Sequence, residues 1–450
     1  MRRQTGNAAK TLLVGALIRA IAIGTIALMA STNIWATQKT LYSFRGGDDG
    51  ANPHGSLIAD SAGNLYGTTS FGGGSSNACP NGCGTVFELI KTTTEYKENV
   101  LYRFQGGSDG YGPWSGALTF DAAGNLYGTT INGGGSANCF EGCGTAFKLT
   151  KGSNGQWTET VLYAFQGAPI DGQGPGGQLL LDAQGNLYGT TFYGGPGSCL
   201  SEGCGLIFQL TPTSSGPWTE NILYTFTGRS DGGIPSGALS IDTKGNLFGT
   251  TTVDGSSNGG TVFEFSPLAG TWTLSTLFSF DGSVGSETGL NPDGGVILDP
   301  AGNLYGTALC GGFAVRPKTW SPCAAGFGTV FQLSRGADGV WTEQVLVRFH
   351  TVKQEAFPDT PLVRDQAGNL YGTTFYGGDL TGIGGGTVYE VLRNSDGTWS
   401  ERVLSRFLGT TLAGGTTPYS GVLRDALGNL YGTTYSRGRY GYGVVYQVTP

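Results

Sequence analysis

Short apolar runs alternate with polar residues along the chain, and four kinds of run follow one another in a fixed order. The first is "GSLIAD" (Gly55–Asp60), the second "GNLYGTT" (Gly63–Thr69), the third "GTVFELI" (Gly84–Ile90) and the fourth "WTETVLYAF" (Trp157–Phe165). Alternating runs that are separated by Gly and Asn turns predict antiparallel strands. No segment after residue 36 keeps a helical period, so the pattern predicts an all-β protein.

The heptapeptide GNLYGTT, with two close variants, occurs seven times and sets the architecture. Its asparagines lie 57 to 66 residues apart, at Asn64, Asn125, Asn186, Asn246, Asn303, Asn369 and Asn429. Seven repeats of four strands predict a seven-bladed β-propeller with four antiparallel strands per blade, as a single domain over residues 37–450. A fourth-strand segment opens this domain (Thr40–Phe44) and a third-strand segment ends it (Gly443–Pro450). We therefore expect an N-terminal outer strand to complete the last blade and close the ring.

Each first strand ends in an Asp, and a Gly-Asn pair opens the second strand, as in "DSAGNLY" (Asp60–Tyr66). Asp accepts hydrogen bonds from turn amides, while Gly and Asn tolerate positive φ, so each repeat is expected to contain a tight hairpin. We expect Tyr66 to pack on the neighbouring blade and Gly67 to permit the close approach of a neighbouring sheet.

The first 36 residues differ from the rest of the chain. Basic residues are followed by an apolar run from Thr11 to Ala30 and by "NIWA", the layout of a secretory signal peptide. An uncleaved N-terminal anchor is the alternative, and only in that case is a membrane association expected. Removal of residues 1–36 would change the formal charge from −7 to −11. An acidic chain without basic clusters is not expected to bind nucleic acid. The predicted location is the cell envelope or the extracellular space.

The eight cysteines form four local pairs, each between a heptapeptide and the next third-strand segment. The pairs are Cys79/Cys83, Cys139/Cys143, Cys199/Cys204 and Cys310/Cys323. The other three repeats lack both cysteines, and paired gain or loss predicts disulfides in an exported protein. A zinc site is the alternative, but the chain offers only His54 and His350 as further ligands of the usual kind. We expect no metal site.

The succession of "DxxGNLYGTT", a Gly-Gly loop and "GTVFxL" resembles the GloVer tandem-repeat proteins (choice-of-anchor type), which are exported bacterial β-propeller proteins. The resemblance covers essentially the whole chain after residue 36. It implies a propeller-like repeat and an exported location, and it implies no particular activity.

Ligands usually meet a propeller on the face where the second-to-third and fourth-to-first loops lie. Flat side chains in Gly-rich loops suit stacking on sugar rings, although each could instead pack under its own loop. The candidate ligand-binding residues are Phe71, Trp114, Phe192, Tyr193, Trp320, Phe375, Tyr376 and Tyr435, with Tyr111 and Tyr419 nearby. Asp-Gly pairs at Asp49, Asp109, Asp171 and Asp231 either make turns or offer oxygen ligands to Ca²⁺.

Catalysis would require departures from the repeat. The candidate residues are His350 and Glu355, which lie in "HTVKQEAFPD", and His54, in the loop that leads into blade 1. A His with a Glu can transfer protons. A drifted, solvated loop explains the same residues, and the chain shows no nucleophile elbow, metal triad or phosphate loop.

We interpret the chain as an exported, non-catalytic propeller that binds a polysaccharide or a protein partner through its loops. It is expected to be a monomer without a cofactor, Ca²⁺ being the one cofactor considered. Two alternatives remain: a propeller-type lyase or hydrolase with a His/Glu site at the channel mouth, and a purely structural surface protein.

Overall fold

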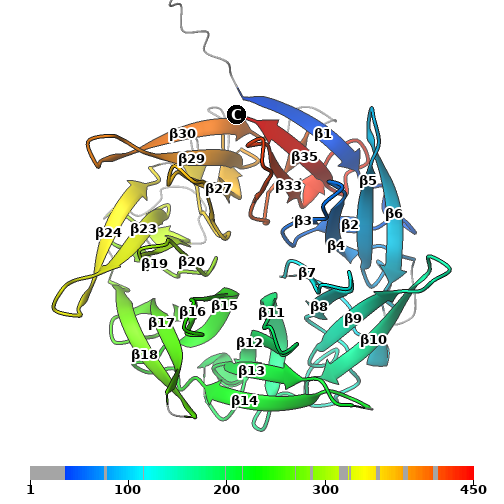
Figure 1. The fold of residues 1–450 in the computed structure, drawn as a ribbon, viewed down its shortest axis with the longest axis horizontal. Helices are drawn as coiled ribbons and strands as arrows, with labels where there is room; N and C mark the ends of the chain where they lie inside the picture. Colours follow the sequence, from blue (N-terminus) through cyan, green and yellow to red (C-terminus); the bar gives the residue numbers. More distant parts are fainter. Residues whose placement is uncertain are drawn as a thin grey trace, which may run out of the picture.

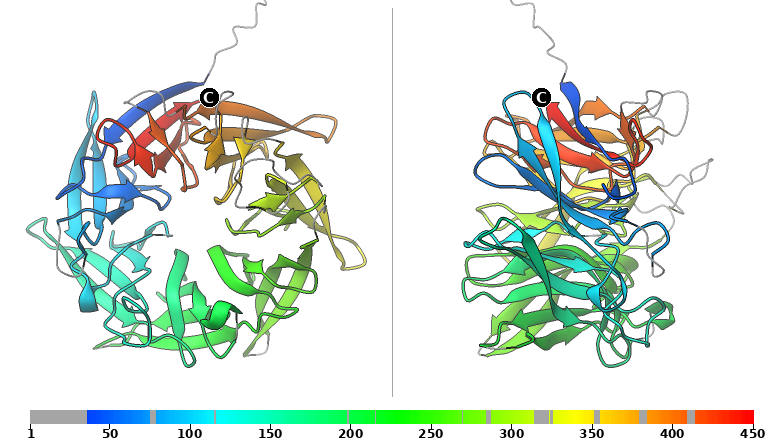
Figure 2. Two further views of the ribbon diagram at one scale, coloured as in Figure 1. Left: turned by 180° about the vertical axis from the view of Figure 1, so that it is seen from behind. Right: turned by 90° about the vertical axis from the view of Figure 1, so that its right-hand side faces the viewer.

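The strands predicted from the repeat form a closed ring in a computed structural model of the chain (Figure 1). The structure describes residues 36–74, 79–114, 116–197, 199–214, 216–268, 270–283, 287–313, 323, 326–350, 355–378, 384–408 and 414–450. The predicted signal segment therefore lies outside the described residues, except for Ala36. Figure 2 shows the ring from behind and from the side. The described residues contain no helix of the length and apolarity that a membrane span requires.

The described strands build seven antiparallel blades, which confirms the predicted fold class. Blade 1 contains β2 (Ala51–Pro53), β3 (Ile58–Ala59), β4 (Leu65–Phe71), β5 (Thr85–Lys91) and β6 (Tyr96–Arg103), and blade 2 contains β7 (Thr119–Phe120), β8 (Leu126–Thr130), β9 (Thr145–Lys151) and β10 (Trp157–Ala164). Blade 3 contains β11 (Gly172–Leu181), β12 (Leu187–Gly194), β13 (Leu206–Thr211) and β14 (Thr219–Thr225), and blade 4 contains β15 (Gly233–Ile241), β16 (Leu247–Val253), β17 (Asn258–Leu268) and β18 (Thr271–Asp281).

The remaining blades carry short two-stranded extensions. Blade 5 contains β20 (Val296–Leu298), β21 (Leu304–Ala308), β23 (Thr329–Arg335) and β24 (Trp341–Arg348), and blade 6 contains β26 (Val363–Arg364), β27 (Leu370–Thr374), β29 (Thr387–Arg393) and β30 (Trp399–Arg406). Blade 7 contains β32 (Leu423–Arg424), β33 (Leu430–Thr434), β35 (Val444–Thr449) and β1 (Thr37–Ser43). The extensions are β19 (Gly289–Leu290) with β22 (Cys310–Gly311), β25 (Glu355–Ala356) with β28 (Tyr376–Gly377), and β31 (Gly415–Thr416) with β34 (Ser436–Arg437). Two 3₁₀ turns, Gly107–Asp109 and Cys199–Ser201, lie in loops.

The two ends of the chain meet in blade 7, as predicted. β1 pairs antiparallel with β35, from Thr37 opposite Thr449 to Ser43 opposite Val444. The first and last strands lie side by side in Figure 1, blue beside red. This pairing gives the last blade its outer strand and removes an exposed sheet edge.

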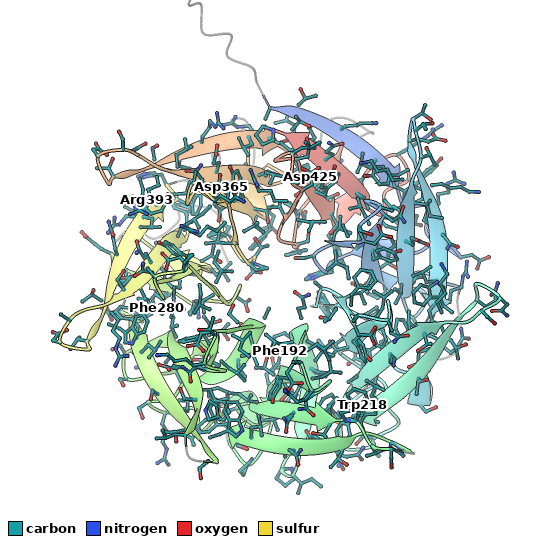
Figure 3. All side chains as sticks on the ribbon, in the orientation of Figure 1. Phe192, Trp218, Phe280, Asp365, Arg393 and Asp425 are labelled. Atoms are coloured by element: carbon teal, nitrogen blue, oxygen red, sulfur yellow. A yellow bond between two sulfur atoms is a disulfide. The ribbon has the colours of Figure 1, made fainter. Side chains whose placement is uncertain are left out.

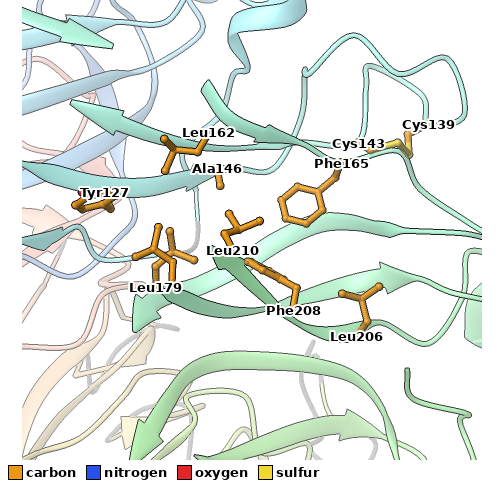
Figure 4. Close-up of a cluster of buried hydrophobic side chains, with 11 residues drawn as sticks. Tyr127, Cys139, Cys143, Ala146, Leu162, Phe165, Leu179, Leu206, Phe208 and Leu210 are labelled. Carbon is orange, nitrogen blue, oxygen red and sulfur yellow. A yellow bond between two sulfur atoms is a disulfide. The ribbon is translucent and has the colours of Figure 1, made fainter. Parts of the chain in front are cut away.

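The hydrophobic core lies between neighbouring blades rather than at the centre of the ring. The cluster between blades 2 and 3 is representative (Figure 4) and joins Tyr127, Leu162 and Phe165 to Leu179, Leu206, Phe208 and Leu210. Comparable clusters join the other neighbouring blades. Each blade therefore needs both neighbours to bury its two faces.

Two residues of the heptapeptide serve different packing purposes. The ring of Tyr66 packs on the next blade, with its centroid 5.1 Å from that of Phe120, as expected. The expectation for Gly67 was wrong. A Cβ on Gly67 would lie 2.7 Å from Cζ of Phe87 and 2.9 Å from Cδ2 of Leu57, which both belong to blade 1. The glycine therefore makes room for side chains of its own blade.

The Asp side chain closes the first hairpin of every blade. In blade 2, Oδ1 of Asp121 accepts hydrogen bonds from the backbone N–H groups of Ala123 and Asn125, both at 2.9 Å. Its Oδ2 accepts from Nδ2 of Asn125 at 2.6 Å and from the hydroxyl of Tyr127 at 3.1 Å. An Asp-to-Asn hairpin bond of the same kind recurs in the other six blades, at Asp60, Asp182, Asp242, Asp299, Asp365 and Asp425. The repeat thus conserves a self-capped turn within the chain.

Replacing Asp121 by Ala is expected to lower the free energy of unfolding by about 1–3 kcal/mol, because several donors lose their acceptor together. Urea titration followed by Trp fluorescence measures the change. The matched control is Asp338→Ala, since the exposed Asp338 accepts one hydrogen bond, from the backbone N–H of Val340. Equal losses in the two variants would contradict the special role of the hairpin Asp.

All eight cysteines are paired as predicted, Cys79 with Cys83, Cys139 with Cys143, Cys199 with Cys204, and Cys310 with Cys323. No cysteine remains as a zinc ligand. The disulfides close the second-to-third loops of blades 1, 2, 3 and 5. Persistent disulfides of this number are typical of proteins from oxidising compartments.

Candidate functional site

A proline fixes the loop that leads into each blade. A Cβ on the glycine at the start of the third strand would come within 2.4–2.7 Å of Cδ of the proline of the next blade. Only glycine therefore fits beneath the pyrrolidine ring of that proline. Each of these glycines also has a positive φ. The seven prolines are Pro53, Pro113, Pro175, Pro235, Pro292, Pro358 and Pro418. Their packing places the residue after each proline at an equivalent point of the ring.

These seven residues, which we call the rim positions, differ from blade to blade. They are His54, Trp114, Gly176, Ser236, Asp293, Asp359 and Tyr419. Five of them, all except Trp114 and Gly176, line a central cavity of about 480 Å³ together with residues from every blade. At Gly176 the ring of Phe192 fills the free space, since a Cβ there would lie 2.6 Å from its Cζ. Figure 3 shows Phe192 at the inner edge of the ring.

Aromatic side chains form a continuous group on one side of the rim, which we call the aromatic arc: Trp114, His54, Tyr419, Tyr435, Phe375 and Tyr376. The imidazole of His54 stacks on the ring of Tyr419, with centroids 4.7 Å apart and an angle of 12° between the planes. Trp114 meets His54 edge to face at 5.4 Å and is 44% exposed. The arc spans blades 6, 7, 1 and 2 and opens to solvent at Trp114.

His54 is a neutral member of the arc. Burial among the neighbouring rings lowers the pKa of its imidazole to about 3, and a hydrogen bond with the backbone of Trp114 offsets only part of this effect. An imidazole with so low a pKa is neutral at pH 7, where it is a weak base and its remaining N–H is a very weak acid. His54 is therefore suited to stacking rather than to proton transfer.

Two of the rim positions, Asp293 and Asp359, carry carboxyl groups. Asp359 forms a side-chain hydrogen bond with Asp293, and its Oδ1 is buried without a donor. Burial, followed by the charge of Asp293 and this hydrogen bond, raises the pKa of Asp359 well above its usual range. A protonated carboxyl of Asp359 would donate to Asp293, so that the pair would share one proton. Burial, then Tyr376 and then Asp359, raises the pKa of Tyr419 to about 12, so the pair is close to the aromatic arc.

The structure separates the two histidines proposed for catalysis. His350 follows β24, the outer strand of blade 5, is exposed, and packs its ring 4.5 Å from that of Phe313. It is not among the residues that line the central cavity, whereas His54 is. Glu355 belongs to β25, where it pairs with Gly377, and its side chain lies outside the described part of the chain.

The structure gathers some of the predicted ligand-binding aromatics and leaves others apart. Trp114, Phe375, Tyr376 and Tyr435 belong to the aromatic arc, although Phe375 is buried. Phe192 lines the cavity across the rim, with Tyr193 beside it at 6.4 Å between centroids. Phe71 is exposed at the end of β4 and has no contact with the arc among the described ring pairs, and Trp320 lies outside the described residues.

The four Asp-Gly sites act as turn acceptors. Each of Asp49, Asp109, Asp171 and Asp231 accepts a tyrosine hydroxyl at 2.9–3.0 Å and a backbone N–H at 2.6–2.9 Å. Within the described ranges no three His, Cys, Asp or Glu side chains are grouped as metal ligands would be. These contacts support the turn interpretation.

A family model, the Gloeobacter/Verrucomicrobia repeat, matches the chain over residues 22–199 and 137–316, which together span more than half of its length. The chain belongs to this repeat family. No curated protein sequence matches this chain. Among solved structures, it is similar to a putative 6-phosphogluconolactonase from Bacteroides uniformis (14% identity, TM-score 0.46, covering 77% of this chain and 83% of that one). It is also similar to a gluconolactonase from Xanthomonas campestris (15% identity, TM-score 0.39, covering 75% and 86%).

Sequence reasoning missed the carboxyl pair of this Gloeobacter/Verrucomicrobia repeat protein. The signal was nevertheless available, because aligning the seven loops on their prolines places two carboxylates at the same position of consecutive repeats. Asp293 and Asp359 are the carboxylates at that position. Their contact with each other could not be inferred, since it depends on the curvature of the ring between blades 5 and 6.

Proposed function

We propose that this protein is an exported binding protein and that the channel mouth holds the sugar rings of a polysaccharide. The observation that carries the proposal is the asymmetric rim, with an aromatic arc on one side and a carboxyl pair on the other, above a cavity of about 480 Å³. Concave sites with aromatic walls and a few placed polar groups are the usual form of a small-ligand site.

Each half of the rim suits one part of a sugar. The exposed face of Trp114 and the half-buried ring of Tyr419 offer flat apolar surface to the C–H face of a pyranose. The oxygens of Asp293 and Asp359 are acceptors for hydroxyl groups at the ring edge. The neutral state of His54 favours binding over acid–base catalysis. The four disulfides, which need an oxidising compartment, support export.

Soluble glycans provide the test, because a ligand that binds only the folded state raises the melting temperature. We expect a saturable rise of the melting temperature of the oxidised protein with one class of glycan. Tyr419→Ala is expected to weaken that binding by about 10- to 100-fold, because stacking area and the support of His54 are lost together.

Phe71→Ala is the matched control, since Phe71 lies on the same face outside the aromatic arc. Its affinity for the glycan should equal that of the unmodified protein. If no glycan shifts the melting temperature, or if both variants lose affinity alike, the channel mouth is not a glycan site. A protein partner or a structural role would then be the better explanation.

A further inference from the structure

The two carboxyl groups at the rim lie in a cavity whose lining also includes the basic side chain of Arg424. Asp293 and Asp359 both line the central cavity, and Oδ1 of Asp359 is buried without a hydrogen-bond donor. No basic side chain forms an ion pair with either carboxyl in the described part of the chain. A proton shared by the two groups would limit the repulsion between their charges.

The groups around the pair favour an organic cation over a metal ion. Tyr419 lines the same cavity as the pair and is the ring that stacks on His54 in the aromatic arc. Aromatic faces attract ammonium groups, and the attraction increases when water is excluded. A Ca²⁺ ion takes six to eight oxygen ligands, whereas this rim joins two carboxyl groups to rings.

We propose that the carboxyl pair in the central cavity makes the channel mouth selective for amino sugars, whose ammonium group would lie against Asp293 and Asp359. This inference rests on the proposed glycan site. On binding, the ammonium group keeps its three protons and donates hydrogen bonds to the pair. The shared proton leaves Asp359 for the solvent, so the complex contains two carboxylates and one cation.

Isothermal titration calorimetry of the full oxidised chain tests the proposal with three probes: a glucosamine oligomer, its N-acetylated counterpart of equal length, and CaCl₂ alone. At about pH 5.5 the amines are protonated. We expect the glucosamine oligomer to bind at least 10-fold more tightly than the N-acetylated oligomer. Titrations in two buffers of different ionisation enthalpy should show close to one proton released per ammonium group bound, and none for the N-acetylated oligomer.

Two variants assign the effect to the pair. Asp359→Asn keeps the shape of the neutral carboxyl, so the protein should fold, while the preference and the proton release should disappear. Asp293→Asn provides an independent second variant with the same expected result. Asp338 lies in the exposed turn between β23 and β24 and does not line the cavity. Asp338→Asn should therefore leave the preference and the proton release unchanged, and it controls for the overall acidic charge.

Each outcome decides between the hypotheses. Equal or tighter binding of the N-acetylated oligomer would overturn the amino-sugar inference and leave the glycan site standing. A preference that survives both rim variants would overturn it as well, because it would reflect general charge. Ca²⁺ binding that is lost in the rim variants, without binding of the amine, would replace it by a metal site. Binding of neither oligomer, with no response to any other glycan, would refute the glycan site itself.

Discussion

Deleting β1 (Thr37–Ser43) is expected to destabilise the whole ring by about 5 kcal/mol or more, a large part of the stability of a typical domain. The deletion removes every backbone hydrogen bond between β1 and β35 and exposes the edge of β35. It also uncovers the cluster between blades 7 and 1, against which Leu41 and Tyr42 pack. The core lies between blades, so opening one junction weakens the support of both neighbours.

Urea titration and size-exclusion chromatography measure the result, because an open edge also promotes self-association. The decisive control is a circular permutant in which residues 37–43 follow Pro450 through a short turn. Thr37 already lies opposite Thr449, so such a turn would make β35 and β1 an ordinary hairpin like those of the other blades. The permutant should recover most of the lost stability. A truncated chain as stable as the full chain would show that closure contributes little.

Stability is expected to fall between about pH 5 and pH 8. Four glutamates occupy equivalent points of the fourth strands, and Oε1 of each is buried without a hydrogen-bond partner: Glu98, Glu159, Glu220 and Glu343. Burial is the main cause that raises their pKa values from 4.5 to about 7, and to about 8 for Glu220. Asp49, Asp109 and Asp171 face the first three and add to the effect, whereas Arg45 and Arg103 beside Glu98 and Arg348 beside Glu343 oppose it.

The sign follows from proton binding. Between pH 4.5 and pH 7 the folded chain holds more protons on these carboxyls than the unfolded chain, so the free energy of unfolding decreases as the pH rises. The stabilisation is complete below about pH 4.5 and is lost as the pH passes 7 to 8. The full difference corresponds to about 3 kcal/mol per group, and we take about half because the groups are partly exposed. Over four groups the expected loss is roughly 6 kcal/mol.

Unfolding by urea at pH 5, 6.5 and 8 measures this slope. Replacing the four glutamates by Gln should flatten it while the fold is retained, because Gln has the same shape and does not ionise. Below pH 4 a second loss is expected, since the hydrogen bonds of the hairpin turns outweigh the effect of burial and lower the pKa values of Asp60, Asp121 and Asp425. A quadruple variant with an unchanged slope would refute the assignment to these glutamates.

The elements that repeat could be predicted from the sequence, because each depends on local chemistry. The Asp hairpins, the four strands per blade and the cysteine pairs all lie within one repeat. Closure by β1 was also predictable, since the chain begins with one kind of strand and ends with another. The prediction for Gly67 was wrong because the alternation of apolar and polar residues along a strand does not show which side chains pack over a glycine.

The site could be predicted only in part, because it is made by contacts between distant repeats. His54 was singled out as one of two histidines, but its stacking on Tyr419 joins blade 1 to blade 7 and depends on ring closure. The aromatics after the heptapeptides were identified by type, and the structure divides them between the arc, the cavity and the outer loops. The Asp293–Asp359 pair requires the relative placement of two blades, which no single repeat encodes.

The rim positions also show where the side chain can differ while the backbone of the loop stays the same. The proline and the glycine beneath it hold the loop backbone, so a substitution at the next residue alters the mouth of the ring without disturbing the hairpins or the core. The repeated frame thus holds six different residue types at seven equivalent points, so blades of one repeat build a rim without seven-fold symmetry.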